Sequence, residues 1–302
     1  MPKKLEEKDW NLILERIKVG KCTPFLGAGA CAGTLPLGGT IAEEWAQKYG
    51  YPLDDCADLV RVAQFLAIEV DPMFPKENLL SQFEKKLKQD GPPDFKDKYE
   101  PHSVLAALPL PVYMTTNYDD FMVQALKNNN KKPKRELCKW NNFIEDFPSV
   151  WDDEQGFDPT PYDPIVFHLH GHSEVPESIV LTEDDYLDFL VNISRDQALL
   201  PPRIQRALTG TSLLFIGYSL ADWNFRVLFR GLIFSTERSL RRVSISVQLP
   251  PIESNKSNLT AQKAQKYLDK YFGRIDIKVY WGTAQEFMKE LRQRWEEFKN
   301  AS

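Results

Sequence analysis

The sequence lacks several features that would assign a protein to a particular class. Cysteine is scarce: only four occur in 302 residues, at positions 22, 31, 56 and 138, and no two form a C-x-x-C pair. This spacing predicts neither a zinc site nor a disulfide framework, so we expect buried, reduced thiols. There is also no apolar run long enough to cross a bilayer, and residues 1–9 lack the apolar segment of a signal peptide. We therefore expect a cytoplasmic protein without membrane contact.

An excess of basic charge is missing as well. The formal net charge is −5 at pH 7, whereas non-specific nucleic-acid binding requires a basic surface that displaces counterions. We therefore expect no direct nucleic-acid binding. The chain does have a 42% content of hydrophobic residues, which is enough for a full core in a single domain spanning residues 1–302.

A glycine-rich loop is the first candidate functional segment. The apolar residues 25–26 run into Gly27-Ala28-Gly29-Ala30. Glycine lets a ligand approach main-chain N–H groups, as a diphosphate requires. The same residue pattern is common at structural turns, so the loop alone leaves both interpretations open.

The segment after the loop argues against a dehydrogenase. A dinucleotide-binding helix should begin at the glycines, but Thr40 and Glu43 have the spacing of a capping box, which predicts a helix from Thr40 that ends at Gly50. No acidic residue ends a second strand about twenty residues on, where a ribose-binding carboxylate belongs. A nucleotide bound here is therefore held differently.

A second strand, at residues 112–116, runs directly into Asn117, Asp119 and Asp120. The carboxyl ends of strands in an open parallel sheet are where ligands bind, so these side chains are candidates for chemistry. The alternative is that Asn117 makes the turn and one of the aspartates caps the following helix. The sequence leaves both open.

Three histidines follow a third strand. Strand alternation over residues 165–170 predicts that His168 and His170 share one face, with His172 two residues beyond. No carboxylate or cysteine stands at close ligand spacing, so we expect no metal. A single working histidine at the strand end is the favoured interpretation.

The alternation of strands and helices indicates the fold class. A further apolar strand at residues 212–216 leads to a glycine-bearing corner with Gly217, Tyr218, Ser219 and Asp222, and two more strands are predicted near residues 243–247 and 275–280. This pattern predicts an α/β fold with a Rossmann-like, doubly wound, mostly parallel sheet. We expect a helical insertion at about residues 52–108, a surface excursion at about residues 128–163, and no zinc module.

Four polar or glycine-bearing turns, here called corners, follow the predicted strands after residues 26, 116, 169 and 216. Taken in order, these corners resemble the sirtuin-like (silent information regulator 2-like) family, specifically its bacterial antiviral branch. The resemblance covers roughly residues 25–229. It implies that the loop Gly27 to Ala30 cradles the diphosphate of NAD+, that Asn117 lies at the nicotinamide ribose, and that His170 is the catalytic base. By the same resemblance, the corner that begins at Gly217 touches the adenosine half.

Further cofactor-binding candidates belong to the same corners. They are Asp119 beside Asn117, and Tyr218, Ser219 and Asp222 after Gly217, of which Asp222 has the alternative role of capping the next helix.

Departures from the family pattern narrow the expected activity. Sirtuin deacylases carry a G-I-P-D-F-R segment and a four-cysteine zinc module, whereas this chain has Gly33-Thr34-Leu35-Pro36 and no such cysteines. Relatives with the same absences resemble NAD-consuming effectors of phage defence. We therefore expect an NAD+ glycohydrolase with NAD+ as its substrate. The alternatives are a non-catalytic module that senses NAD or ADP-ribose and, less favoured, a protein deacylase.

Control of such an activity has to come from outside the catalytic residues, because uncontrolled NAD+ cleavage would kill the host. We expect a homo-oligomer, a separate regulatory protein, or both. The resemblance implies HerA-like ATPases and short Argonautes as candidate partners.

Overall fold

The computed structural model describes residues 5–153, 156–196, 199–218, 242–249 and 258–301. Within these ranges the strands form a seven-stranded sheet in the order β3-β4-β2-β1-β5-β6-β7, and neighbouring strands are parallel throughout. The strands are β1 (Cys22–Leu26), β2 (Val112–Thr115), β3 (Lys134–Leu137), β4 (Ile165–His168), β5 (Ser212–Ile216), β6 (Ser244–Gln248) and β7 (Ile277–Trp281). The predicted Rossmann-like α/β fold is therefore confirmed.

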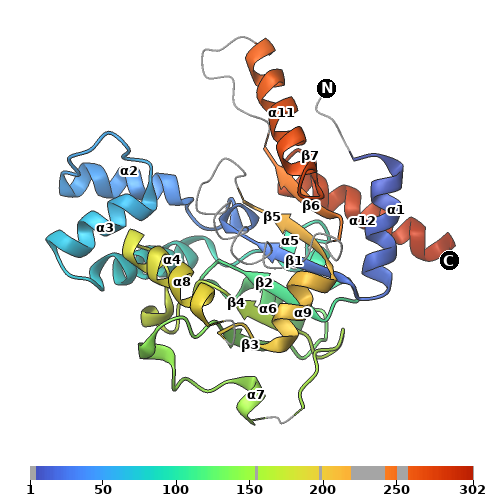
Figure 1. The fold of residues 1–302 in the computed structure, drawn as a ribbon, viewed down its shortest axis with the longest axis horizontal. Helices are drawn as coiled ribbons and strands as arrows, with labels where there is room; N and C mark the ends of the chain where they lie inside the picture. The colour runs from blue at the N-terminus through green and yellow to red at the C-terminus, as the bar shows by residue number, and fades with distance from the viewer. Residues whose placement is uncertain (1–4, 154–155, 197–198, 219–241, 250–257, 302) are drawn as a thin grey trace.

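Helices connect these strands and cover the sheet on both sides (Figure 1). The α-helices are α1 (Glu7–Lys18), α2 (Gly38–Tyr49), α3 (Leu59–Glu69), α4 (Phe74–Asp90), α5 (Pro101–Ala106), α6 (Phe121–Asn128), α7 (Val150–Asp153), α8 (Glu183–Arg195), α9 (Pro202–Gly210), α11 (Asn258–Gly273) and α12 (Ala284–Ala301). The short 3-10 helices in the described part of the chain are η1 (Ala28–Cys31), η2 (Asn142–Ile144) and η3 (Pro176–Ser178).

Both faces of the central sheet are buried, which explains why strands β1, β2, β4 and β5 read as largely apolar runs. Successive residues point to opposite faces: Tyr113 and Leu214 pack with α1, α5, α6 and α12, whereas Met114 and Phe215 pack with α8, α9 and α11. The two faces belong to two separate hydrophobic clusters. The sheet is therefore the middle of three layers.

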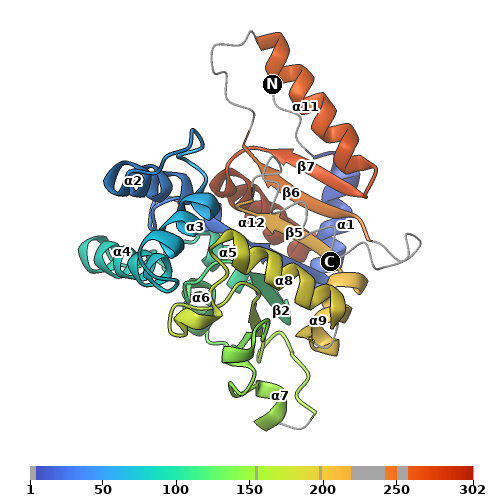
Figure 2. The ribbon, with the colours of Figure 1, turned by 60° about the vertical axis from the view of Figure 1, so that its left-hand side comes forward.

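Helices α2, α3 and α4 form a lobe with its own hydrophobic cluster, on one side of the sheet in both views (Figures 1 and 2). Trp45 and Leu66 are fully buried in this cluster, together with Ile179 from the segment before α8. A buried ion pair, with 2.9 Å between Lys76 Nζ and Asp185 Oδ1, joins α4 to α8. The lobe is thus attached to the sheet layer by both apolar contacts and paired charge.

The strand order places a topological switch point at β1. The neighbours of β1 are β2 on one side and β5 on the other, and the chain builds the sheet outward in both directions from there. In open α/β sheets, ligands bind in the crevice outside the carboxyl ends of the strands at such a point. The loops after β1, β2 and β5 meet at this crevice.

Two details differ from the sequence-based expectations. Helix α2 begins at Gly38 with Leu37 as its N-cap and without a side-chain cap, so the capping box at Thr40 is wrong, although Gly50 ends the helix in a left-handed conformation as expected. The segment expected as a surface excursion contributes β3 to the edge of the sheet. No α-helix among the described residues is long and apolar enough to cross a bilayer.

Candidate active site

A cavity of about 1410 Å³ lies at the carboxyl ends of the central strands. It is lined by residues from all four corners singled out in the sequence, among them Ala28, Gly29, Ala30, Asn117, Asp119, His170, Gly217 and Tyr218. Helices α2 and α3 of the lobe add further walls through Ile41 and Leu59. Ser219 and Asp222 lie outside the described residues.

The glycine loop packs directly against the corner that begins at Gly217. A Cβ atom on Gly29 would lie 2.8 Å from the Cα of Gly217, and one on Gly217 would lie 2.3 Å from the N atom of Ala30. Gly217 also has φ +79°, a conformation that residues with a Cβ rarely adopt. The close approach of two backbones therefore requires glycine at both positions.

Three main-chain N–H groups of the loop donate within the protein. The N–H of Gly27 donates to the carbonyl of Ile216, that of Gly29 to the carbonyl of Gly217, and that of Ala30 to the carbonyl of Gly27, each at 2.9 Å. These donors hold the loop in place and are not directed at a ligand. The loop is therefore both a cavity wall and a structural turn, which joins the two interpretations left open by the sequence.

Asn117 is buried and its side chain is held in one orientation. Its Nδ2 atom donates to the carbonyl oxygen of Gly27 and to Sγ of Cys31, both at 3.2 Å. Its main-chain N–H donates to Oγ1 of Thr115 at 2.9 Å, and its carbonyl oxygen lies 3.2 Å from Nδ1 of His168. Because both protons of Nδ2 are used, Oδ1 is the amide atom left for a ligand, and it accepts no hydrogen bond from the described residues.

The two aspartates after Asn117 have different environments. Oδ1 of Asp119 accepts the N–H of Phe121 at 3.0 Å and so caps the start of α6, while its Oδ2 accepts a bond from Cys31 at 3.2 Å. Asp120 is the formal N-cap residue but makes no side-chain cap bond. Asp119 therefore both caps α6 and lines the cavity.

His170 reaches the cavity from the turn after β4. Its ring is buried and lies edge-on against Tyr186 and Phe189 of α8, with centroid distances of 5.2 and 5.0 Å. Nε2 is buried without a hydrogen-bond partner among the described residues. The ring is therefore held by apolar packing, with one nitrogen uncommitted.

Burial lowers the pKa of His170 to about 3. Transfer of the ring away from water penalises the imidazolium form, and no described carboxylate compensates. His170 is therefore neutral, and able to accept a proton, over the whole physiological pH range. It is also a weaker base than the reference histidine on which the sequence interpretation relied.

The other two histidines form a separate group, so the expectation that His168 and His170 share a face is wrong. Strand β4 ends at His168, and the ring of His168 lies 4.8 Å, centroid to centroid, from that of His172. Arg135 Nη1 lies 3.0 Å from Nε2 of His172 and 3.5 Å from Oδ1 of Asp120. Neither His168 nor His172 lines the cavity.

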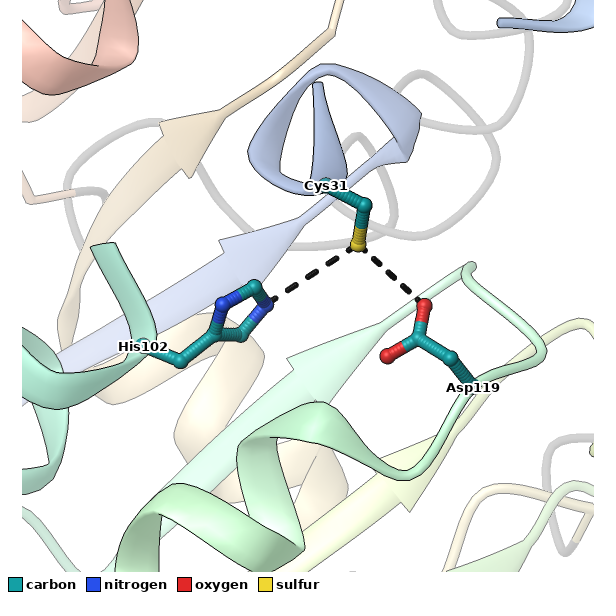
Figure 3. A group of neighbouring side chains, drawn as sticks. All are labelled: Cys31, His102 and Asp119. Atoms are coloured by element: carbon teal, nitrogen blue, oxygen red, sulfur yellow. Dashed lines mark hydrogen bonds between the residues drawn. The ribbon is translucent and has the colours of Figure 1, made fainter. Parts of the chain in front are cut away.

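A second polar group, which the sequence analysis did not identify as a group, adjoins Asn117 through Cys31. Figure 3 shows its members Cys31, His102 and Asp119. Cys31 Sγ lies 3.2 Å from Oδ2 of Asp119 and 4.0 Å from Nε2 of His102, and Nδ1 of His102 lies 2.6 Å from Oε1 of Glu100. Burial and the Asp119 carboxylate raise the pKa of the Cys31 thiol well above its ordinary value. Burial opposes ionisation of Glu100, but hydrogen bonds, chiefly with His102, hold the pKa of Glu100 below its usual range.

The cavity wall is acidic. The carboxylate residues that line it are Asp58, Asp94, Asp97, Glu100, Asp119 and Glu286. Lys289 is the cation among the described lining residues. The wall therefore favours a cationic group in the ligand.

Comparisons with known proteins agree with this architecture. The family model for the SIR2-like domain matches residues 111–273. A protein named NAD(+) hydrolase ThsA from Bacillus cereus (strain MSX-D12) is 27% identical over 208 residues, which cover 67% of this chain and 37% of that protein. A protein of the same name from Enterococcus faecium is 26% identical over 211 residues, covering 70% of this chain and 39% of that protein.

A solved structure titled "Structural Basis for the Mechanism and Regulation of Sir2 Enzymes" aligns with a TM-score of 0.41 and 11% identity over 98% of this chain and 100% of that one. The chain spans a little over a third of the length of the curated relatives that it matches. The family match covers more than half of the sequence. The chain therefore belongs to the SIR2-like family.

Proposed function

We propose that this chain is an NAD+ glycohydrolase domain that releases nicotinamide and ADP-ribose from NAD+. The observation that carries the proposal is that Asn117 and His170, from the ends of two different strands, line the same cavity as the glycine loop. The matched relatives named NAD(+) hydrolase ThsA support it. NAD+ is the substrate, and the proposed reaction involves no metal.

The reaction breaks the bond between nicotinamide and C1′ of its ribose. The bonding electron pair leaves with the nicotinamide, which becomes neutral, and positive charge develops on the sugar. Water then attacks C1′ and gives up one proton. His170 accepts this proton, because its ring lines the cavity and burial keeps that ring neutral.

Asn117 positions the ribose. Its Nδ2 is fixed by Gly27 and Cys31, so Oδ1 has a defined direction and can accept a bond from a ribose hydroxyl or from the attacking water. A pre-oriented acceptor costs no reorganisation when the transition state forms. The amide is neutral and is not consumed in the reaction.

The charge distribution of the cavity suits one end of the substrate. The nicotinamide ring of NAD+ is cationic before the bond breaks, and the ribose is cationic as it breaks, so the acidic wall at Asp119 and Glu100 stabilises both states. The diphosphate is anionic, and the family resemblance assigns it to the loop Gly27 to Ala30 and the corner at Gly217 and Tyr218.

The test is nicotinamide release by the purified chain, followed by chromatography. We expect His170→Ala and Asn117→Ala each to reduce turnover by about 10²-fold or more, because general-base catalysis and oriented hydrogen bonds contribute on this scale. His172→Asn serves as the matched control, because it changes a buried histidine of the same segment that does not line the cavity. NAD+ binding measured by calorimetry separates loss of chemistry from loss of affinity.

Three results would contradict the proposal. Full turnover in His170→Ala would remove His170 as the base. Tight NAD+ binding without any nicotinamide release, with candidate partners present, would favour a non-catalytic sensing module. Formation of acyl-ADP-ribose from an added acyl-peptide would instead indicate a deacylase.

Regulation and biological role extend the same proposal. We place the activity in the cytoplasm, in defence against phage, where depletion of NAD+ stops the infected cell. Control comes from self-assembly, from a separate protein such as a HerA-like ATPase or a short Argonaute, or from both. A fully active monomer in gel filtration would refute this part.

A further inference from the structure

Two groups of metal-ligating side chains occur among the described residues, and each places its ligand atoms within 4.8 Å of one another. One consists of Asp120, His168 and His172. The other consists of Cys31, His102 and Asp119. They differ in what already occupies the space between the ligands.

The group at Asp120 is already paired with a cation of the protein. The Arg135 guanidinium lies 3.0 Å from Nε2 of His172 and 3.5 Å from Oδ1 of Asp120, and it also pairs with Glu174. A metal ion placed there would be repelled by the guanidinium. This group is therefore a structural ion-pair network.

The group at Cys31 has the dimensions of a zinc site. With ordinary Zn–S and Zn–N or Zn–O bond lengths, tetrahedral geometry sets sulfur about 3.6 Å from each of the other two ligand atoms. The observed distances from Cys31 Sγ are 3.2 Å to Oδ2 of Asp119 and 4.0 Å to Nε2 of His102. Both distances lie within about 0.4 Å of that tetrahedral spacing, and the ligand atoms of His102 and Asp119 lie within 4.8 Å of each other.

Three separate segments supply these ligands and aim them at one point. Cys31 ends η1, His102 lies in the first turn of α5, and Asp119 follows β2 (Figure 3). Oδ1 of Asp119 caps α6 through Phe121, which leaves Oδ2 directed at the sulfur. Such convergence fixes the ligands before a metal arrives.

The surroundings of His102 complete the arrangement. Glu100 Oε1 lies 2.6 Å from Nδ1 of His102, so Nδ1 carries the proton and Nε2 presents its lone pair to Cys31. Metal-ligating histidines commonly have a carboxylate on the second ring nitrogen, and that partner increases the basicity of the ligand. The two nearby carboxylates, Glu100 and Asp119, both add negative charge beside the thiol. A divalent cation neutralises this charge.

We infer that Cys31, His102 and Asp119 bind one Zn²⁺ ion at the inner wall of the cavity, with Glu100 as the positioning residue. Binding forms a sulfur–zinc bond and releases the thiol proton to solvent. The mixed sulfur, nitrogen and oxygen ligand set selects Zn²⁺ over Mg²⁺ and Ca²⁺, which require oxygen ligands. The site differs from a four-cysteine zinc module. Because Cys31, Asp119 and Glu100 also border the proposed substrate site, its test measures metal binding and not turnover.

The experiment titrates the full, chelator-treated chain with Zn²⁺ in competition with a chromophoric chelator, under reducing conditions. We expect one Zn²⁺ per chain. Titration with Co²⁺ should produce the charge-transfer absorption of a thiolate ligand. Cys31→Ser and Asp119→Asn should each weaken Zn²⁺ binding by at least about tenfold, and Glu100→Gln should weaken it by about 10–100-fold through loss of the charged partner of His102.

Cys56→Ser is the matched control, because Cys56 is a half-buried free thiol outside the group. Its Zn²⁺ affinity should equal that of the unmodified chain. Absence of stoichiometric Zn²⁺ binding would overturn the inference, as would bound Co²⁺ without thiolate absorption. Unchanged affinity in folded Asp119→Asn or Glu100→Gln, verified by circular dichroism, would overturn it independently of whether Cys31→Ser folds.

Discussion

Two buried histidines should make the protein sensitive to mild acid. Burial lowers the pKa of His168 and of His170 to about 3, far below the value of about 6.5 for an unfolded chain. As the pH falls below 6.5, the unfolded state takes up two protons that the folded state does not. Stability is therefore lost progressively between pH 6.5 and pH 3, the opposite of what a histidine with a raised pKa would cause.

The magnitude follows from these values. Between about pH 7 and about pH 5, each histidine reduces the free energy of unfolding by about 2 kcal/mol, so the two together account for about 4 kcal/mol. Asp120 and Glu100 contribute little in this window, because the pKa of each is held below its usual range. Burial raises the pKa of Glu136, which opposes part of the loss as the pH falls.

The assay is urea unfolding, followed by tryptophan fluorescence at both pH values. His170→Gln removes one of the two groups, so its loss of stability between the two pH values should be about 2 kcal/mol smaller than that of the unmodified chain. Tyr186→Phe is the control, because it changes the ring that packs against His170 without removing a group that titrates in this range. Equal losses in His170→Gln and the unmodified chain would refute the reasoning.

Two further predictions concern the framework of the site. Gly217→Ala should cost at least about 2 kcal/mol, through left-handed backbone strain and the collision with Ala30, and a melting temperature within error of the unmodified chain would contradict this. Lys76→Met should cost about 3–5 kcal/mol in urea unfolding, because it leaves Asp185 without its buried cation. Lys88→Met, at an exposed pair with Glu84, should change stability by less than about 1 kcal/mol, and an equal effect of the two substitutions would show that burial does not matter here.

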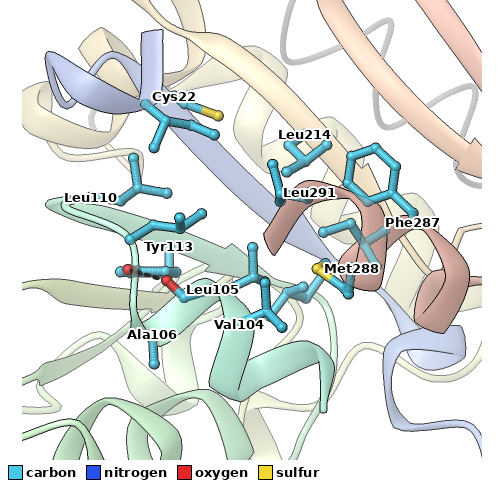
Figure 4. Packing of buried hydrophobic residues seen from close by; sticks show 14 of the residues in the cluster. Cys22, Val104, Leu105, Ala106, Leu110, Tyr113, Leu214, Phe287, Met288 and Leu291 are labelled. Atoms are coloured by element: carbon cyan, nitrogen blue, oxygen red, sulfur yellow. Dashed lines mark hydrogen bonds between the residues drawn. The ribbon is translucent and has the colours of Figure 1, made fainter. Parts of the chain in front are cut away.

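The core of the fold could be predicted because its signal is local. Apolar runs marked most of the strands. Local spacing also sets the start of α12, where Thr283 and Glu286 form a reciprocal cap. Figure 4 shows the result on one face of the sheet, where Leu214 of β5 lies near Phe287 and Leu291 of α12. Such packing requires only the right periodicity.

Strand β3 was not predicted, because its residues have the composition of a polar surface segment. It begins with Lys134 and Arg135 and lies at the edge of the sheet, where charged side chains are tolerated. These residues form a strand because they pair in parallel with β4. That pairing is a tertiary contact, which local composition does not encode.

The site was predictable to the extent that it depends on topology. The corners at Asn117 and His170 follow parallel strands, and the switch-point rule brings such corners to one crevice. Their placement on the cavity agrees with this rule, whereas their chemical roles stay predictions. The depressed pKa of His170 was not foreseeable, because the rings that bury it come from α8.

The group at Cys31 could not be predicted from the spacing of its residues in the sequence. Cys31 and His102 are 71 residues apart, and Cys31 and Asp119 are 88 residues apart. Metal-ligand motifs are recognised by ligands that lie close together in the sequence, whereas these three ligands come from three separate segments. The sequence does show two polar residues close together at the start of α5, Glu100 as its N-cap and His102 in its first turn.

The contact between Gly29 and Gly217 determines when the cavity can form during translation. The glycine loop leaves the ribosome early, but the backbone that receives it is synthesised only after most of the chain has emerged. Until β5 docks beside β1, the nascent polypeptide has one side of the crevice without its wall. A fragment that ends before β5 therefore lacks one wall of the cavity.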